Sequence, residues 1–223
     1  MTWRDLAFVH WPVAPESLRG SIPSGLTLDT FQGDAWLGVV PFRMTGVRPR
    51  GVPPIPGLSS IVELNVRTYV VAEEKPGVWF YSLDATSRLA VRGARVSFHL
   101  PYFDARMSVR RQEETIHYRS ERTHRGAPKA HFVGSYRPKG SAGRSNLERW
   151  LTERYCLYSA SKDGRLFRGD VHHPPWPLEN AEAELEVLDM TRIVGIDPPR
   201  REPLVHFAER LDVVAWLPRP VLG

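Results

Sequence analysis

The feature that most constrains the fold is a set of apolar runs with two-residue alternation, of which IVELNVRTYVV (61–71) is the clearest. Side chains of a β-strand point alternately to its two faces, so this period predicts an extended chain. One face carries aliphatic and threonine side chains, namely Val62, Leu64, Val66, Thr68 and Val70. The other face carries Glu63, Asn65, Arg67 and Tyr69. This polar row fits two interpretations, the solvent face of a sheet or the wall of a pocket.

Further runs of this kind predict strands along most of the chain. Single strands are expected at 6–13, 77–85 and 181–190, a hairpin across 26–44, hairpin arms at roughly 105–123, 130–137 and 163–173, and a short apolar strand at the end of 204–220. The segment 48–57 is rich in proline and glycine and predicts a loop.

Helical patterns are few and short. We expect a helical turn within 15–23 and helices over 86–96 and 145–159. The last begins with Ser145 and Glu148 in the spacing of a capping box. No repeat or linker divides the chain, so the sequence predicts a single, mostly-β (α+β) domain over residues 1–223.

Composition is that of a soluble globular protein, with 42% hydrophobic and 25% charged residues. No apolar run approaches the roughly 18 residues that span a bilayer, so no membrane partner is expected. The start, MTWRDLAFVHWPV, lacks the layout of a signal peptide, and we expect a cytoplasmic protein. The single cysteine, Cys156, excludes an internal disulfide and is expected in the core.

The net charge of +5 raises the question of nucleic-acid binding. The basic residues are spread over the whole chain, and the densest patch, 106–125, mixes arginines with glutamates. Mixed charge is typical of a solvated outer face. No helix-turn-helix, zinc-finger or aromatic stacking signature accompanies the patch. We therefore expect no nucleic-acid partner, whereas a homo-oligomer stays open.

Signatures of cofactor and metal binding are missing. The chain has no G-x-G-x-x-G, no Walker A loop and no G-x-S-x-G elbow, so no cofactor is expected. His172 and His173 are adjacent, and adjacent side chains of a strand point to opposite faces, which disfavours joint binding of one ion. We expect no metal site and a structural role for the HHPPW segment.

The candidate acid–base residues are Glu63, His99, Tyr102 and His172. For Glu63 the alternative is surface exposure, and only an inward orientation would raise its pKa into a useful range. His99 and Tyr102 are equally consistent with core residues that have a polar tip. Arg67 is suited to binding a substrate carboxylate with its planar guanidinium, or to anchoring a neighbouring strand.

The stretches ELNVRTYV, GVWFYSLDA, ARVSFHLPY and LERWLTERYCLYS…HHPPWPL resemble the bacterial YqjF-like family, which is grouped with the acetoacetate decarboxylase-like superfamily. The resemblance covers nearly the whole chain. It implies a strongly bent antiparallel sheet that forms a cone or open barrel, with a few peripheral helices and a pocket inside. It also places Glu63 where the decarboxylases keep a pocket glutamate, which favours the pocket interpretation of its row.

The decarboxylases form a Schiff base on a lysine that follows a Tyr-Pro pair, in the pattern Tyr-Pro-Lys-Lys. The matching stretch here is Leu100-Pro101-Tyr102-Phe103, so aromatic residues occupy both lysine positions. A tyrosine cannot form an imine, and none of the four lysines lies near a strand end that could substitute. Decarboxylation through a Schiff base is therefore not expected.

Three hypotheses follow. The first is a protein that binds a small acidic or oxygenated molecule, with Glu63, Asn65, Arg67, Tyr69, His99, Tyr102 and His172 as candidate site residues. The second is a lyase, isomerase or hydratase that uses Glu63 as acid or base. The third is a structural or partner-binding domain with a vestigial pocket.

Overall fold

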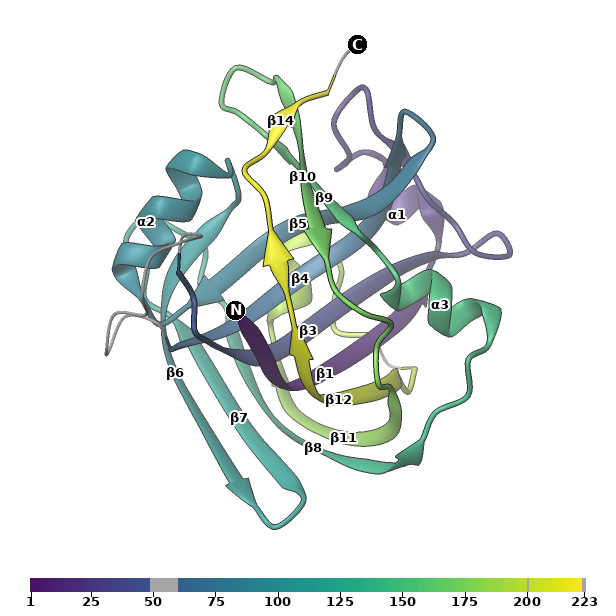
Figure 1. The fold of residues 1–223 in the computed structure, drawn as a ribbon, viewed down its shortest axis with the longest axis vertical. Helices are drawn as coiled ribbons and strands as arrows, with labels where there is room; N and C mark the ends of the chain where they lie inside the picture. The colour runs from purple at the N-terminus through teal and green to yellow at the C-terminus, as the bar shows by residue number, and fades with distance from the viewer. Residues whose placement is uncertain (49–59, 200, 222–223) are drawn as a thin grey trace.

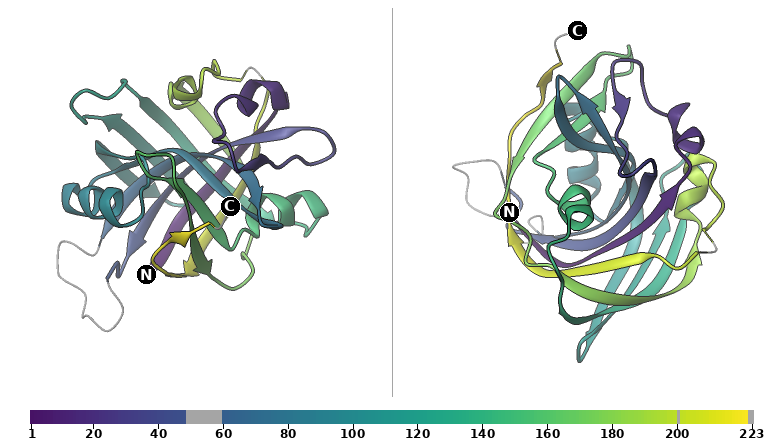
Figure 2. Two further views of the ribbon diagram at one scale, coloured as in Figure 1. Left: turned by 90° about the horizontal axis from the view of Figure 1, so that it is seen from above. Right: turned by 90° about the vertical axis from the view of Figure 1, so that its right-hand side faces the viewer.

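The computed structural model describes residues 1–48, 60–199 and 201–221. All fourteen described strands belong to one strongly bent sheet (Figures 1 and 2). Hydrogen-bonded neighbours run from β5 through β6, β7, β8, β11, β12, β1 and β3 to β4, which also pairs with β5. The contacts of β11 with β12 and of β5 with β6 involve only two and three residue pairs. The sheet is therefore a partial ring, and β9 and β10 extend it beyond β5.

The strands are β1 (Thr2–Val13), β2 (Thr27–Leu28), β3 (Ala35–Thr45), β4 (Ile61–Ala72), β5 (Lys75–Ala85), β6 (Tyr102–Gln112), β7 (Thr115–Arg122), β8 (His131–Ser141), β9 (Cys156–Ala160), β10 (Leu166–His172), β11 (Glu179–Leu188), β12 (Leu204–Asp212), β13 (Val214–Ala215) and β14 (Arg219–Pro220). The helices are α1 (Pro15–Arg19), α2 (Arg88–Ser97), α3 (Asn146–Thr152) and the 3₁₀ turn η1 (Met190–Val194). No helix among these described residues is long and apolar enough to cross a membrane.

The predicted mostly-β class and the bent sheet are confirmed, but the sheet is mixed rather than antiparallel. Strand β5 pairs in parallel with both β6 and β9. A parallel pair needs a crossover connection, and α2 supplies it between β5 and β6.

Three predicted elements differ from the structure. The helix expected over 145–159 ends at Thr152, because Cys156–Ala160 instead form β9 and pair with β10. The hairpin expected across 26–44 is reduced to one antiparallel bridge between Phe31 and Asp34, since β2 pairs with β4 rather than β3. The arm expected at 105–123 is two strands, β6 and β7, which turn at Glu113 with a φ of 53°. Apart from Arg48, the predicted 48–57 loop lies outside the described residues.

Two apolar clusters lie on opposite faces of β1, β3 and β4. The inner cluster, enclosed by the bent sheet, includes Val9, Leu37, Leu64, Tyr118 and Phe132. The outer cluster packs the other face against α2 and the segment near Trp176, and includes Leu6, Phe8, Phe42, Val91 and Trp176. These three strands are therefore covered on both sides, which positions the polar row of β4 inside the molecule.

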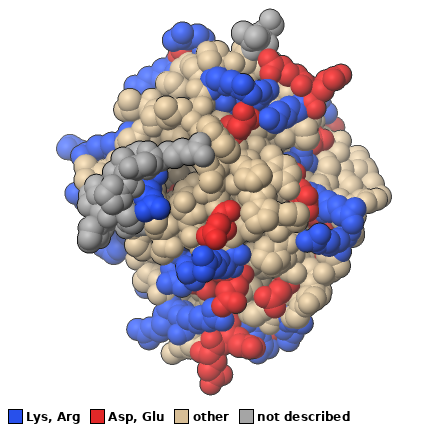
Figure 3. All heavy atoms as spheres, in the orientation of Figure 1, with Lys and Arg blue, Asp and Glu red and all other residues tan. Residues whose placement is uncertain are grey.

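Charges on the surface are mixed in sign. On the face drawn in Figure 3, lysine and arginine side chains lie interspersed with aspartate and glutamate. Charged side chains at the surface also pair with one another, as Arg210 does with Asp212 at 3.3 Å.

Candidate functional site

The polar row of β4 is buried. Glu63 is 3% exposed, Asn65 4% and Tyr69 0%, whereas Arg67 is half-buried. The row therefore is not the solvent face of the sheet. Strand register places Phe42 beside Glu63 and Gly38 beside Arg67, so β3 lies directly alongside the polar row.

Glu63 and Tyr102 form a pair at one end of the row. The Tyr102 hydroxyl donates to Glu63 Oε2 at 2.8 Å. Burial raises the pKa of Glu63 to about 7, and the hydrogen bonds from Tyr102 and Asn65 only partly oppose that rise. Burial also raises the pKa of Tyr102 well above its usual value, so its hydroxyl keeps its proton. The pair thus offers a carboxyl that changes its charge near neutral pH.

His10, Arg67 and Tyr69 form a second group further along the row. Tyr69 Oη lies 2.6 Å from His10 Nε2 and 3.4 Å from Arg67 Nη2. The Arg67 guanidinium also lies 5.1 Å from the centre of the Phe8 ring. Burial and the Arg67 charge hold the pKa of His10 well below its usual value, so the imidazole is neutral.

Gly38 makes this group possible. It lies on β3 between His10 and Arg67 in the strand register. A Cβ atom at this position would lie 3.0 Å from the His10 ring and 3.3 Å from Arg67 Cγ. A side chain on Gly38 would therefore push His10 and Arg67 apart, in keeping with the use of glycine where groups approach closely.

Several buried polar atoms near this face have no partner among the described residues. They include His10 Nδ1, Asn65 Oδ1 and Arg67 Nε. Arg67 forms no ion pair with an acidic side chain in the described part of the chain. In the part of the chain that the structure describes, Arg67 is thus a cation beside the Phe8 ring with no carboxylate paired to it.

The region around α3 borders the second group. The Arg154 guanidinium lies over the rings of Tyr69 and Trp150, at 4.9 and 4.4 Å, and pairs with Asp29 at 2.7 Å. His206 Nε2 lies 3.2 Å from Glu148 Oε1 at the start of α3. These residues border the site at the Tyr69 end of the polar row, away from Glu63.

The remaining predicted residues lie elsewhere. His99 packs on the Phe167 ring at 4.5 Å, and His172 is exposed at the end of β10. Neither shares a described hydrogen bond, ion pair or ring contact with Glu63 or Arg67. His10 and Gly38 were missed as candidates, although a glycine inside the strand pattern of 35–45 is a signal of close approach.

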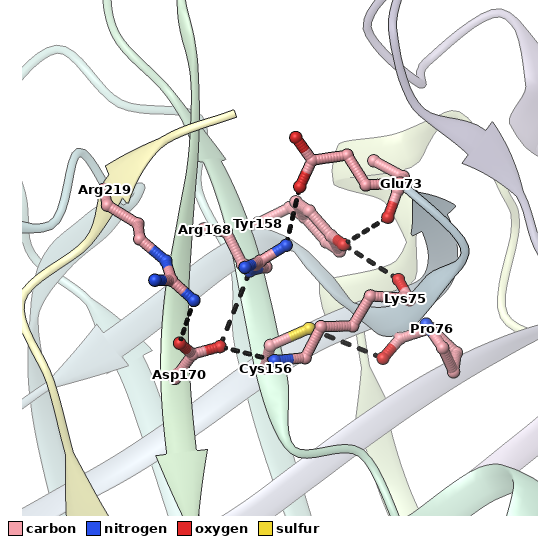
Figure 4. Close-up of polar contacts among 9 residues, drawn as sticks. Glu73, Lys75, Pro76, Cys156, Tyr158, Arg168, Asp170 and Arg219 are labelled. Atoms are coloured by element: carbon pink, nitrogen blue, oxygen red, sulfur yellow. Dashed lines mark hydrogen bonds and ion pairs between the residues drawn. The ribbon is translucent and has the colours of Figure 1, made fainter. Parts of the chain in front are cut away.

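Lys75, the first residue of β5, and Cys156, the first residue of β9, belong to a separate cluster (Figure 4). Lys75 pairs with Asp170 at 2.8 Å, and Asp170 also pairs with Arg219 at 2.9 Å. Cys156 is buried as expected, and burial raises the pKa of its thiol, which donates to the Pro76 carbonyl at 3.4 Å. This cluster therefore contributes neither a free lysine amine nor a thiolate.

Two hollows at the surface, of about 310 and 620 Å³, lie away from the polar row and are lined by other residues, such as Leu166 in the first and His117 in the second. Within residues 1–48, 60–199 and 201–221, no group of three or more His, Cys, Asp or Glu side chains is placed to hold a metal ion.

Comparison with solved structures bears on the fold. The enzyme MppR of enduracididine biosynthesis, complexed with the condensation product of pyruvate and imidazole 4-carboxaldehyde, aligns with a TM-score of 0.70 and 13% identity over 98% of this chain and 87% of its own. Acetoacetate decarboxylase from Legionella pneumophila aligns with a TM-score of 0.63 and 12% identity over 100% and 88% of the two chains. The fold is therefore acetoacetate decarboxylase-like.

Sequence comparison identifies the family. A family model described as an uncharacterized conserved protein, DUF2071, matches residues 1–212. The uncharacterized protein YqjF of Bacillus subtilis is 46% identical over 218 residues, which cover 96% of this chain and 89% of YqjF. The chain therefore belongs to the DUF2071 family and is similar to YqjF.

Proposed function

We propose that the polar face of β4 binds a small organic acid and that the protein acts as a small-molecule binding protein. The observation that carries the proposal is Arg67, a half-buried cation without an acidic partner in the described chain. Guanidinium groups pair readily with carboxylates, and a charge removed from water is stabilised by such a partner. Asn65 and the Glu63–Tyr102 pair lie on the same face and supply further polar contacts.

The structural neighbours support a carboxylate as the ligand. MppR was also solved in complex with pyruvate, at 13% identity to this chain. Low identity carries only the fold, so pyruvate serves here as a first probe of chemical class. Because the unpartnered atoms are closed to solvent, the covering layer of α2 and the Trp176 segment has to move when a ligand enters.

Calorimetric titration with small carboxylic acids tests the proposal. Arg67→Met is expected to weaken binding about 10- to 100-fold, because a hydrogen-bonded charge contact contributes about 1.5–3 kcal/mol. Arg106→Met, on an exposed arginine of β6, is the matched control and should bind as the wild type does. No binding by any acid, or equal binding by Arg67→Met, would show that the site is vestigial.

A second candidate is an enzyme that uses Glu63 as acid or base. It is favoured by the pKa of about 7, which suits proton transfer at neutral pH. The test is turnover of bound hydroxy and oxo acids, followed by NMR, in the wild type and in Glu63→Gln. Conversion that disappears in Glu63→Gln supports the enzyme, and binding without conversion supports the binding protein. Borohydride trapping with an oxo acid should give no lysine adduct.

A further inference from the structure

We infer that the acid that fits this face carries a hydroxyl group next to its carboxylate, as a 2-hydroxy acid does, and that the matching 2-oxo acid fits less well. The inference rests on the proposed function and specifies its ligand. It follows from the hydrogen-bonding roles of two of the buried atoms that lack a partner among the described residues, Asn65 Oδ1 and Arg67 Nε.

Arg67 Nε is a donor. Arginine can only donate, so Arg67 Nη2 gives a proton to Tyr69 Oη at 3.4 Å, while the Nε proton has no partner among the described residues. Arg67 Nε–H is therefore a buried donor that awaits an acceptor.

The oxygen of Asn65 is an acceptor that awaits a donor. The side-chain amide of Asn65 hydrogen-bonds to the Glu63 carboxyl and stabilises its charged form, which requires the NH₂ group to face Glu63. Oδ1 is then turned away from Glu63 and has no partner. Asn65 lies two residues from Arg67 on the same face of β4, so both border the same part of the site.

A ligand that satisfies both atoms needs an anionic acceptor and a neutral donor. A carboxylate accepts from Arg67, and a hydroxyl group on the adjacent carbon donates to Asn65 Oδ1. The carbonyl of a 2-oxo acid has no proton and would leave Oδ1 buried and unpaired, which costs binding free energy. A 2-amino acid could donate, but its ammonium group would lie beside the Arg67 cation.

Calorimetric titration of the full chain with matched pairs tests this inference, namely lactate against pyruvate and 2-hydroxybutyrate against 2-oxobutyrate, with alanine as the amino counterpart. The hydroxy acid of each pair is expected to bind about tenfold more tightly or better, and alanine more weakly than both. Asn65→Leu should remove the preference and leave the affinity for the oxo acid within about threefold. Asn180→Leu, at an exposed position of β11, should keep the preference.

The possible outcomes separate this inference from the proposed function. Equal affinity within each pair, or tighter binding of the oxo acid, overturns the inference but leaves acid binding intact. Absence of binding by every acid overturns both. The wild-type comparison needs no variant, so a failure of Asn65→Leu to fold does not affect it. A crystal structure with lactate in which a water molecule occupies the place of the hydroxyl at Asn65 Oδ1 would also overturn it.

Discussion

Glu63 shows how position changes the chemistry of one carboxyl group. In the unfolded chain it titrates near 4.5, and in the folded protein near 7. Between these values the folded state holds a proton that the unfolded state has lost, so the free energy of unfolding falls as pH rises through this window. A shift of this size corresponds to at most about 3.5 kcal/mol. Ionisation of Glu63 therefore opposes folding above neutral pH.

Glu63→Gln should remove this pH dependence, because the amide is neutral at every pH and its oxygen can still accept from Tyr102. Urea unfolding of the variant is expected to give a free energy that falls less between pH 5 and pH 8 than that of the wild type. At pH 8 the variant should be the more stable protein. Glu186→Gln, at an exposed position of β11, is the control and should follow the wild type. A parallel pH profile for Glu63→Gln would contradict the buried titration.

Asp84 and Arg122 form a buried ion pair on the inner side of the sheet. Arg122 Nη2 lies 2.7 Å from Asp84 Oδ1, with side-chain exposures of 2% and 0%. The guanidinium also lies 4.1 Å from the centre of the Phe103 ring. Removal of one partner from such a pair leaves a buried charge without compensation.

Arg122→Met is therefore expected to lower the free energy of unfolding by roughly 3–5 kcal/mol at pH 8, measured by urea denaturation. The double variant with Asp84→Asn should recover part of this loss, because the remaining side chain is neutral. If the double variant is no more stable than Arg122→Met, the charge of Asp84 is not the cause of the loss.

At the level of elements, local signals were predicted well and tertiary competition was not. Ser145 and Glu148 form the capping box that their spacing indicated. The helix that follows is only seven residues long, because Cys156 and Tyr158 bury their side chains as part of β9. Residues 153–159 continue the helical pattern, but Cys156–Ala160 pair with β10 instead, and the local sequence does not reveal this partner strand. The same holds for β2, whose partner β4 lies about forty residues away.

The capping box of α3 should contribute measurably to stability. Ser145 Oγ accepts from Glu148 N at 3.2 Å, and Glu148 Oε2 accepts from Ser145 N at 2.6 Å. A helix this short is not stable alone, so its ends and its packing determine whether it forms. Ser145→Ala is expected to lower the free energy of unfolding by about 1 kcal/mol in urea denaturation. Ser108→Ala, on the exposed side of β6, should change it by less than about 0.5 kcal/mol.

At the level of the whole molecule, the two-residue alternation in 61–71 correctly predicted that the side chains of the polar row share one face of β4. It could not predict which residues cover that face. The cover comes from residues far along the chain, such as Trp150 against Tyr69 at 4.8 Å and Trp176 against Phe8 at 4.8 Å. The family resemblance indicated the bent sheet, and it favoured burial of Glu63. The group of His10, Gly38 and Arg67 was not predicted, because it exists only once three strands lie in register.

Amide hydrogen exchange should reveal this double cover. Strands β1, β3 and β4 each pair on both edges and lie between the inner and outer apolar clusters, so their amides open only when the whole sheet unfolds. We expect the slowest exchange there, at a free energy equal to that of global unfolding in urea. Amides of β13, of β14 and of the β6–β7 turn at Glu113 should exchange fastest, because they have one paired edge or lie in an exposed turn. Faster exchange in β4 than in the β6–β7 hairpin would mean that the outer layer opens readily and leaves the polar face accessible in the native state.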